Sequence, residues 1–312
     1  MNKVPIVFAF DNNLVLPAAV CISSLLTSAR ADTYYDIFIL HANDEDIDKT
    51  LLNRVETHFS NCKISYRSVP DTFKEGFEIR GITIAAYYRL LIPELIPEYD
   101  KVIYSDVDVV FRQDLSHIYF QTDLGDCYIA GVNNLAHLDA DLNHHYGATL
   151  GLDTRSVICS GFLLMDCKRI KADGLVEKFI EQSKNKYKFQ DQDILNICCR
   201  GRIKMLPPKY SLLTYISFMA INWPKELVQV WSAEDIAEAM TAGNIHYNGQ
   251  KPWRGACINF DIWWEYYRKS PVYDPKYYFD FFYGKLNELD SLPLVKRLKI
   301  LARYFIYGKS KS

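Results

Sequence analysis

The sequence predicts an α/β fold with a mainly parallel sheet. Short runs of β-branched and aromatic residues alternate with longer segments in which apolar residues recur every three or four positions. Strands that alternate with helices in this way pair in parallel and carry the helices on the faces of the sheet. The 312 residues suffice for one large domain or two small ones, and a hydrophobic fraction of 49% is usual for a globular protein.

The first third of the chain contains the clearest strand and helix signals. Each expected strand is a short apolar or alternating run, and each expected helix carries an apolar stripe. Pro17 suits the first turn of a helix, because that turn does not use its backbone N–H groups. The predicted elements are strands at residues 4–10, 35–41 and 63–69, and helices at residues 17–29, 45–59 and 82–91, the last ended by Pro93.

Polar side chains follow the first strand. Asp11, Asn12 and Asn13 separate it from the first helix, without the Gly-x-Gly-x-x-Gly turn of dinucleotide-binding proteins. One interpretation is that Asp11 and Asn13 contact a base or a ribose. The alternative is that they cap the start of the helix, where Asp and Asn are preferred residues. Arg89 lies in the apolar half of the helix at 82–91. Its guanidinium either binds a diphosphate or stays in water while the aliphatic part of the side chain is buried.

Two carboxylates interrupt the next strand, residues 101–110. Asp106 and Asp108 are two positions apart, so they point to the same side if the strand continues or turns gently. Like charges on one face repel each other, and a hard divalent cation with oxygen ligands removes that repulsion. We therefore predict a metal site, with an acidic strand end open to water as the alternative.

Further strands are predicted at residues 127–132 and 157–165 and a helix at 175–183, and a surface loop is expected around His144 and His145. Residues 189–196 begin another helix, with Asp191 and Asp193 near its positive end. The segment 244–253 contains His246 and Lys251. His246 is a candidate third metal ligand, because Mn²⁺ accepts an imidazole beside carboxylates, and Lys251 is a candidate phosphate-binding cation.

Basic residues are concentrated at the C-terminus. Residues 291–312 contain six basic and no acidic residues, and Leu294, Leu298, Leu301 and Phe305 recur at helical spacing. A basic helix with an apolar stripe binds anionic membrane surfaces; the alternative is a terminal helix packed on its own domain. We expect a main domain at residues 1–265 and an aromatic and basic helical tail at residues 266–312.

Several classes of protein are disfavoured. A formal net charge of −2 argues against a generally basic nucleic-acid binder, and we expect no nucleic-acid partner. No apolar run approaches the roughly 20 residues of a membrane span. The eight cysteines include no C-x-x-C pair. We therefore expect a cytoplasmic protein that attaches peripherally to the cytoplasmic face of the membrane.

Five motifs occur in order along the chain: Val7–Asn13, Ala86–Leu90, Tyr104–Val109, Phe189–Asn196 and His246–Trp253. Together they resemble glycosyltransferase family 8, which includes lipopolysaccharide galactosyl- and glucosyltransferases and glycogenin. The resemblance spans about residues 4–255 and implies a single-domain, Rossmann-like fold of the GT-A type with a helical C-terminal extension. It also implies the transfer, with retention, of glucose or galactose from a UDP-sugar to a glycan or glycolipid such as lipopolysaccharide, with Mn²⁺, or alternatively Mg²⁺, as cofactor.

The resemblance also implies roles for individual residues. Asp106, Asp108 and His246 would bind the metal, and Asp191 and Gln192 would lie at the transferred sugar. In this chain Cys159 stands where the family usually has Asn, Asn134 stands where Asp is common, and the segment from His246 to Lys251 is one residue shorter than in many members. The remaining implied donor contacts are Ala9, Asp11, Asn13, Arg89, Ser105, Asp106, Val107, Asn134, Gly249 and Lys251.

Two other classes stay open on the sequence alone. The run that begins at Asp106 resembles the nucleophile motif of haloacid dehalogenase phosphatases, although there the motif normally sits on the first strand, near the start of the domain. A sugar-nucleotide-binding protein without catalysis is the other, since Cys159 departs from the family pattern.

Overall fold

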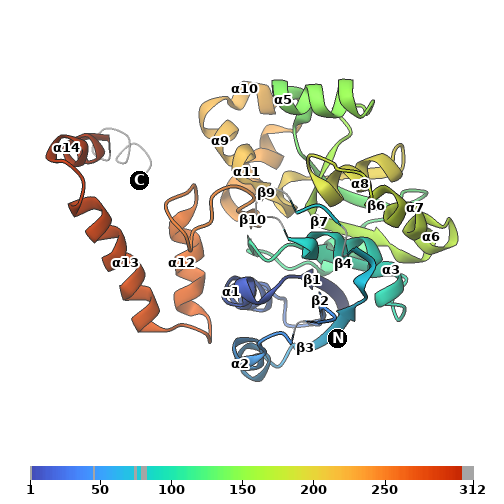
Figure 1. Cartoon of the computed structure of the whole chain (residues 1–312), viewed down its shortest axis with the longest axis horizontal. Coiled ribbons are helices and arrows are strands. Elements are labelled where there is room, and N and C mark those ends of the chain that lie inside the picture. Colours follow the sequence, from blue (N-terminus) through green and yellow to red (C-terminus); the bar gives the residue numbers. More distant parts are fainter. Residues whose placement is uncertain (1, 45, 74–75, 79–82, 304–312) are drawn as a thin grey trace. The chain divides into compact units, whose positions relative to one another are not determined.

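A seven-stranded sheet forms the centre of the computed structural model, which describes residues 2–44, 46–73, 76–78 and 83–303 (Figure 1). The strand order is β3-β2-β1-β4-β7-β6-β8. Every neighbouring pair is parallel except those of β7, which runs antiparallel to β4 and β6, so the predicted mainly parallel sheet is confirmed. The strands are β1 (Asn2–Ala9), β2 (Thr33–Ala42), β3 (Cys62–Val69), β4 (Lys101–Ser105), β6 (Ile129–Asn133), β7 (Ile158–Asp166) and β8 (Ile203–Leu206).

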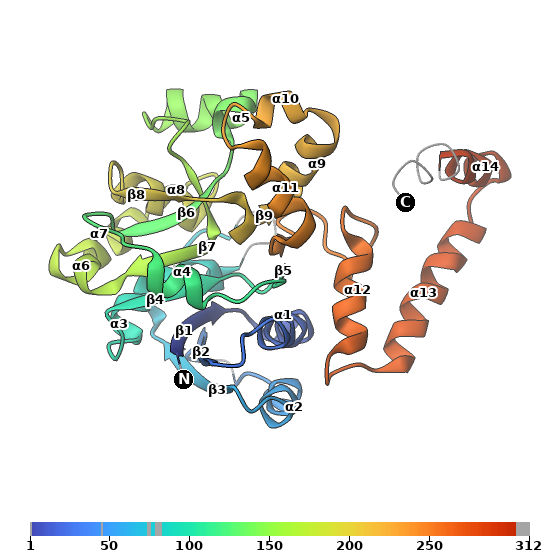
Figure 2. The same ribbon diagram turned by 180° about the vertical axis from the view of Figure 1, so that it is seen from behind.

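Helices cover this sheet (Figure 2). On one face, Val7, Phe38 and Leu40 share a core with apolar residues of η3 (Ile84–Leu91), α7 (Leu175–Gln182) and α8 (Gln190–Cys198). The helix α1 (Val15–Thr27) is buried almost all round, which explains why it is apolar on every side. The strongly apolar β1 is likewise covered on both faces, as expected of a central parallel strand.

Some predicted elements differ from the structure. The helix predicted at 45–59 is α2 (Thr50–His58), and the one predicted at 82–91 is the 3₁₀ helix η3; Glu45 and Ile82 lie outside the described residues. The predicted surface loop at His144 and His145 is wrong. These residues begin a π-helix, η5 (His144–Thr149), and His145 is only 8% exposed because its ring packs against Tyr146 and Phe189.

The strand that carries the two carboxylates does not continue through them. β4 ends at Ser105, and after Asp106–Asp108 the chain enters β5 (Val109–Val110) of a separate three-stranded sheet. In that sheet β10 (Ile245–His246) lies between β5 and β9 (Leu212–Leu213), and its register pairs His246 with Val109. The second sheet therefore brings distant segments of the chain to the end of β4.

The chain divides into two compact units, Met1–Val272 and Tyr273–Ser312. The helix α12 (Phe260–Lys269) belongs to the first unit and continues across the boundary expected at residue 265. The second unit contains α13 (Pro275–Asp290), none of whose residues is buried, and α14 (Leu294–Arg303). Phe305, Lys309 and Lys311 of the predicted tail lie outside the described residues. Among the helices that the structure describes, none is long and apolar enough to cross a membrane.

Candidate active site

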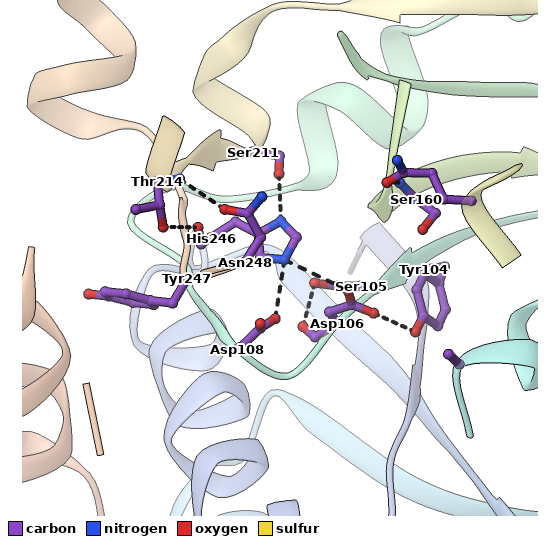
Figure 3. A network of polar contacts seen from close by, with 12 residues as sticks. Tyr104, Ser105, Asp106, Asp108, Ser160, Ser211, Thr214, His246, Tyr247 and Asn248 are labelled. Atoms are coloured by element: carbon purple, nitrogen blue, oxygen red, sulfur yellow. Dashed lines mark hydrogen bonds and ion pairs between the residues drawn. The ribbon is translucent and has the colours of Figure 1, made fainter. Parts of the chain in front are cut away.

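Asp106, Asp108 and His246 converge at the C-terminal end of β4 (Figure 3). The Nε2 atom of His246 lies 3.2 Å from Oδ1 of Asp108 and 3.7 Å from Oδ2 of Asp106. One ligand atom from each residue lies within 4.8 Å of the other two. Two carboxylates and one imidazole match the ligand preferences of Mn²⁺, and Mg²⁺ also binds carboxylates.

The surroundings of His246 fit a metal ligand. Its Nδ1 atom lies 3.2 Å from the hydroxyl of buried Ser211, so a proton on Nδ1 leaves Nε2 free to coordinate. Oδ1 of Asp108 is buried and accepts no hydrogen bond from the described residues; it faces Nε2 of His246 at 3.2 Å, as expected of an oxygen that shares a cation with that ring. Thr214 Oγ1 donates to the His246 carbonyl and holds this loop in place (Figure 3).

Asp106 is oriented by contacts to its other oxygen. Tyr104 donates its hydroxyl to Oδ1 at 2.8 Å, and Nη2 of Arg89 lies 2.9 Å from the same atom. Because both partners engage Oδ1, Oδ2 is left to face His246. The outer partners of a metal site commonly fix its ligands in this way.

Arg89 is buried between two acidic groups. Its Nε atom lies 3.1 Å from Oδ2 of Asp191, Nη1 donates to the Ser160 carbonyl at 2.8 Å, and the guanidinium lies 4.3 Å from the ring centre of Tyr104. With an exposed fraction of 4%, this side chain is occupied by protein groups on several sides. Its contacts in the structure are those of an internal brace between Asp106 and Asp191.

Cations balance the acidic cluster. Lys251 forms an ion pair with Oδ2 of Asp108 and donates to the Tyr247 carbonyl at 2.6 Å. Burial acts to raise the pKa of Asp108, but Lys251 and His246 outweigh it and hold that pKa below its usual range. Burial conversely lowers the pKa of His246, but the Asp108 carboxylate outweighs it and raises the pKa to about 10. A metal that binds here must therefore displace a proton from His246.

The start of α8 supplies Asp191 and Gln192. Burial raises the pKa of Asp191 to about 6 although Arg89 opposes the shift. Gln192 accepts a hydrogen bond from the Ser160 backbone at 3.2 Å through Oε1 and donates to the Tyr146 hydroxyl at 2.6 Å through Nε2. Ser160 belongs to β7, which pairs with β4, so this contact joins Gln192 to a neighbour of the strand at whose end the candidate metal cluster lies.

The sequence model of glycosyl transferase family 8 matches residues 5–257. The chain belongs to glycosyl transferase family 8. This family 8 chain is 29% identical to a putative glycosyltransferase of Haemophilus influenzae over 212 aligned residues. The alignment covers 66% of this chain and 62% of the relative. It is 25% identical to a lipopolysaccharide 1,2-glucosyltransferase of Escherichia coli, over 79% of this chain and 72% of the relative.

The fold of this family 8 member also matches solved GT-A structures. A structure of the galactosyltransferase LgtC, in complex with donor and acceptor sugar analogues, superimposes with a TM-score of 0.70 at 24% identity, over 88% of this chain and 99% of that one. The predicted GT-A fold is therefore confirmed.

Other predicted contacts of this family 8 chain lie near the same end of the sheet. Val7 pairs with Tyr104, so Ala9 and Asp106 lie level at the ends of neighbouring strands. Asp11 accepts from the Asn13 backbone at 2.9 Å and caps the short helix η1 (Asn12–Leu14). In the structure this side chain therefore makes the capping contact that the sequence left open as one alternative.

The remaining predicted residues differ in exposure. Asn134 is buried and its Oδ1 accepts from the Ala136 backbone at 2.9 Å, stabilising a turn in which Leu135 has a φ of 60°. Ser105 and Val107 are buried, whereas Gly249 is exposed. Cys159 is 8% exposed and interacts with the His246 side chain, so the departure from the family pattern lies inside the site.

Sequence reasoning missed several members of the site. Tyr104 and Ser211 contact two of the candidate metal ligands, and Tyr146 contacts Gln192. Tyr104 lies in a strand of mostly apolar residues, and Tyr146 lies in a segment predicted as a loop. The sequence around each of them therefore gave no sign that its hydroxyl contacts the site. Gly161 offered a signal, because a glycine inside a strand often marks a close approach of another group.

Proposed function

We propose that this chain transfers glucose or galactose from a UDP-sugar to a glycan or glycolipid acceptor, with retention at the anomeric carbon and with Mn²⁺, or alternatively Mg²⁺, as cofactor. The observation that carries the proposal is the cluster of Asp106, Asp108 and His246 beside Lys251, in a chain that belongs to family 8. The chain spans 62% of the length of the Haemophilus influenzae relative. Because the match is only partial, the proposed activity rests on the residues of the site and on the family, and not on that relative.

The leaving group explains why cations gather here. UDP leaves readily only when the charge on its diphosphate is neutralised. Asp106, Asp108 and His246 would hold a divalent cation, which when bound supplies this neutralisation. Lys251 forms an ion pair with Asp108 and is partly exposed, so it can reach a phosphate oxygen. With this assistance the leaving side needs no general acid.

The contacts of Asp191 bear on how the configuration is retained. Retention requires either a protein nucleophile or attack by the acceptor on the face that UDP leaves. The Asp191 carboxylate is buried and ion-paired with Arg89, which reduces its nucleophilicity. Gln192 is partly exposed and carries an amide oxygen that can stabilise positive charge on the anomeric carbon. We therefore favour same-face attack; a glycosyl adduct trapped on Asp191 would overturn this choice.

The acceptor is proposed from the relatives. The name of the Escherichia coli relative specifies lipopolysaccharide, which makes the core sugars of a lipopolysaccharide the first acceptor to test for this chain. Other cell-surface glycans are the next candidates.

We also propose that the C-terminal unit attaches the enzyme to the cytoplasmic face of the membrane. Exposed apolar residues are spaced along both of its helices, and Lys296, Arg297 and Lys299 of α14 add positive charge. Apolar and cationic groups together bind anionic lipid surfaces. The exposed apolar residues are Phe279, Tyr283, Leu286, Leu294, Val295, Leu298, Ile300 and Leu301.

One assay tests the transferase against its alternatives. UDP release is measured from UDP-glucose and UDP-galactose, with Mn²⁺ and with EDTA, in the presence of lipopolysaccharide core acceptors. We expect metal-dependent UDP release from one of the two donors. Tight UDP binding without turnover across a range of acceptors would instead indicate a binding protein, and phosphate release from aryl phosphates would indicate a phosphatase, a class that the family assignment disfavours.

A further inference from the structure

The buried pair of His145 and Asp193 has no part in the chemistry described so far. Nε2 of His145 lies 2.8 Å from Oδ2 of Asp193, and the same oxygen accepts from the Phe189 backbone at 3.0 Å. The two residues are 8% and 0% exposed. A single buried contact between two polar side chains contributes little net stability, so this one is better explained by what it positions. It joins the π-helix η5 to the start of α8, where Gln192 lies.

The residue after His145 contacts Gln192 directly. Tyr146 is fully buried, and its ring stacks on Phe189 at 5.9 Å. Its hydroxyl oxygen accepts a hydrogen bond from Nε2 of Gln192 at 2.6 Å. π-helical turns of this kind are uncommon and are found frequently at functional sites.

The Tyr146 hydroxyl keeps its own proton. Burial raises the pKa of Tyr146 far above its usual value, and the negative charge of Asp193 raises it further. The hydroxyl oxygen accepts the hydrogen bond from Nε2 of Gln192, an amide nitrogen that can only donate.

The other end of the Gln192 amide is fixed as well. The Ser160 backbone N–H, which can only donate, points to Oε1 of Gln192 at 3.2 Å. If the amide flipped, its NH₂ group would face this N–H and neither would have an acceptor. The contacts at both ends therefore favour one orientation of the amide.

We propose that Tyr146 is a positioning residue for the transfer reaction. Its hydroxyl, carried on the η5 turn that the His145–Asp193 contact joins to α8, holds the Gln192 amide in one orientation at the donor sugar. This inference rests on the proposed function, in which the amide oxygen of Gln192 stabilises charge on the anomeric carbon. An amide that is free to rotate presents its oxygen for only part of the time, and small misplacements of catalytic groups are costly.

The substitution Tyr146→Phe removes the hydroxyl and keeps the ring. We expect kcat to fall roughly ten- to a hundredfold, while KM for the UDP-sugar and the affinity for Mn²⁺ stay unchanged. Tyr128→Phe is the matched control, because Tyr128 donates to Asp173 at 2.7 Å away from the site, and its kcat should equal that of the wild type. A wild-type kcat in Tyr146→Phe, or an equal loss in both variants, would overturn the inference.

A second readout does not need turnover. Hydrogen exchange of the Gln192 side-chain amide is followed by ¹⁵N NMR, with the signal identified by its absence from Gln192→Met. We expect exchange to be faster in Tyr146→Phe than in the wild type and in Tyr128→Phe. Equal exchange rates in all three proteins would refute the positioning role. Faster exchange in Tyr146→Phe, in a protein that shows no transfer, would instead count against the proposed function alone.

Discussion

Gly161 lies directly against the ring of His246. A Cβ atom added to Gly161 would lie 2.2 Å from Cε1 of His246 and 2.6 Å from Oδ2 of Asp106, distances that folded proteins essentially never show. The Gly161 carbonyl also accepts from the Asp106 backbone at 2.9 Å. The missing side chain therefore allows β7 to pass immediately beside two of the three candidate metal ligands.

Substituting Gly161→Ala should damage metal binding. The new methyl group must displace His246 or Asp106, and we expect the affinity for Mn²⁺ to fall by at least about tenfold, the usual scale for disturbed metal ligands. Isothermal titration with Mn²⁺ measures the effect. Gly255→Ala is the control, because a Cβ there meets nothing within 4 Å. Wild-type affinity in Gly161→Ala would mean that the cluster does not bind the metal as proposed.

Asp108→Ala removes a proposed ligand. We expect UDP release to fall by more than about a hundredfold, since even groups outside the ligand shell are worth ten- to a hundredfold. The circular dichroism spectrum should remain that of the folded protein. Asp126→Ala, at an exposed position, should keep full activity. Activity retained by Asp108→Ala would rule out the metal-site hypothesis.

Arg89→Met should destabilise the protein. The change leaves the Asp106 and Asp191 carboxylates without their shared partner, and breaking a buried ion pair from one side costs roughly 3–5 kcal/mol. Urea unfolding measures the loss. The control Arg169→Met removes a pair with Asp166 in which the Arg169 side chain is 37% exposed, and should cost below about 1 kcal/mol. Similar losses in both variants would contradict the bracing role of Arg89.

Asp114 should contribute to stability in a pH-dependent way. Burial acts to raise its pKa, but hydrogen bonds from Ser116 and from the Arg30 backbone outweigh it and lower the pKa. The contribution is therefore complete above the unfolded-state value, about 3.9, and is lost as the pH falls through the lower folded-state value. Asp114→Asn should lose about 1 kcal/mol at pH 7 and show a flatter decline below pH 4 in unfolding experiments. If the loss of stability below pH 4 is the same in Asp114→Asn as in the wild type, Asp114 does not contribute to the pH dependence.

The C-terminal unit should bind anionic lipid. Reversing the charge of Lys296, Arg297 and Lys299 to Glu should abolish sedimentation with phosphatidylserine vesicles, because each basic group near such a surface contributes about 1 kcal/mol. Truncation after Leu289 should have the same effect. Neutral phosphatidylcholine vesicles serve as the control surface. Vesicle binding that survives both changes would remove the membrane proposal.

The parts of the fold that follow from local pattern could be predicted from the sequence. The strands β1, β2 and β3 are each marked by an apolar or alternating run, and the order of strands and helices indicated a parallel sheet. The candidate metal cluster was predicted from the repulsion between Asp106 and Asp108 and from the segment that carries His246. These inferences depend on chemistry that short stretches of sequence display.

The features that the sequence did not show depend on contacts between distant segments of the chain. His145 looked like a surface residue because its partner, Asp193, is 48 positions away. The contacts of Arg89 with Asp106 and Asp191 appear only after folding, so the sequence did not show them. The break after Ser105 is produced by β10, which draws Val109 into the second sheet. Local periodicity carries no information about any of these pairings.

The second sheet also sets the order in which the site is completed during synthesis. Lys251 and Asp108 are 143 positions apart, and β10 must join β5 before either Lys251 or His246 reaches the acidic pair. A nascent chain that has emerged only through β8 therefore holds Asp106 and Asp108 without two of their neutralising partners. Closing this loop carries an entropic cost, and β10 can dock only after residue 246 has been synthesised. A divalent cation that binds the finished cluster would stabilise the completed chain over its shorter precursors.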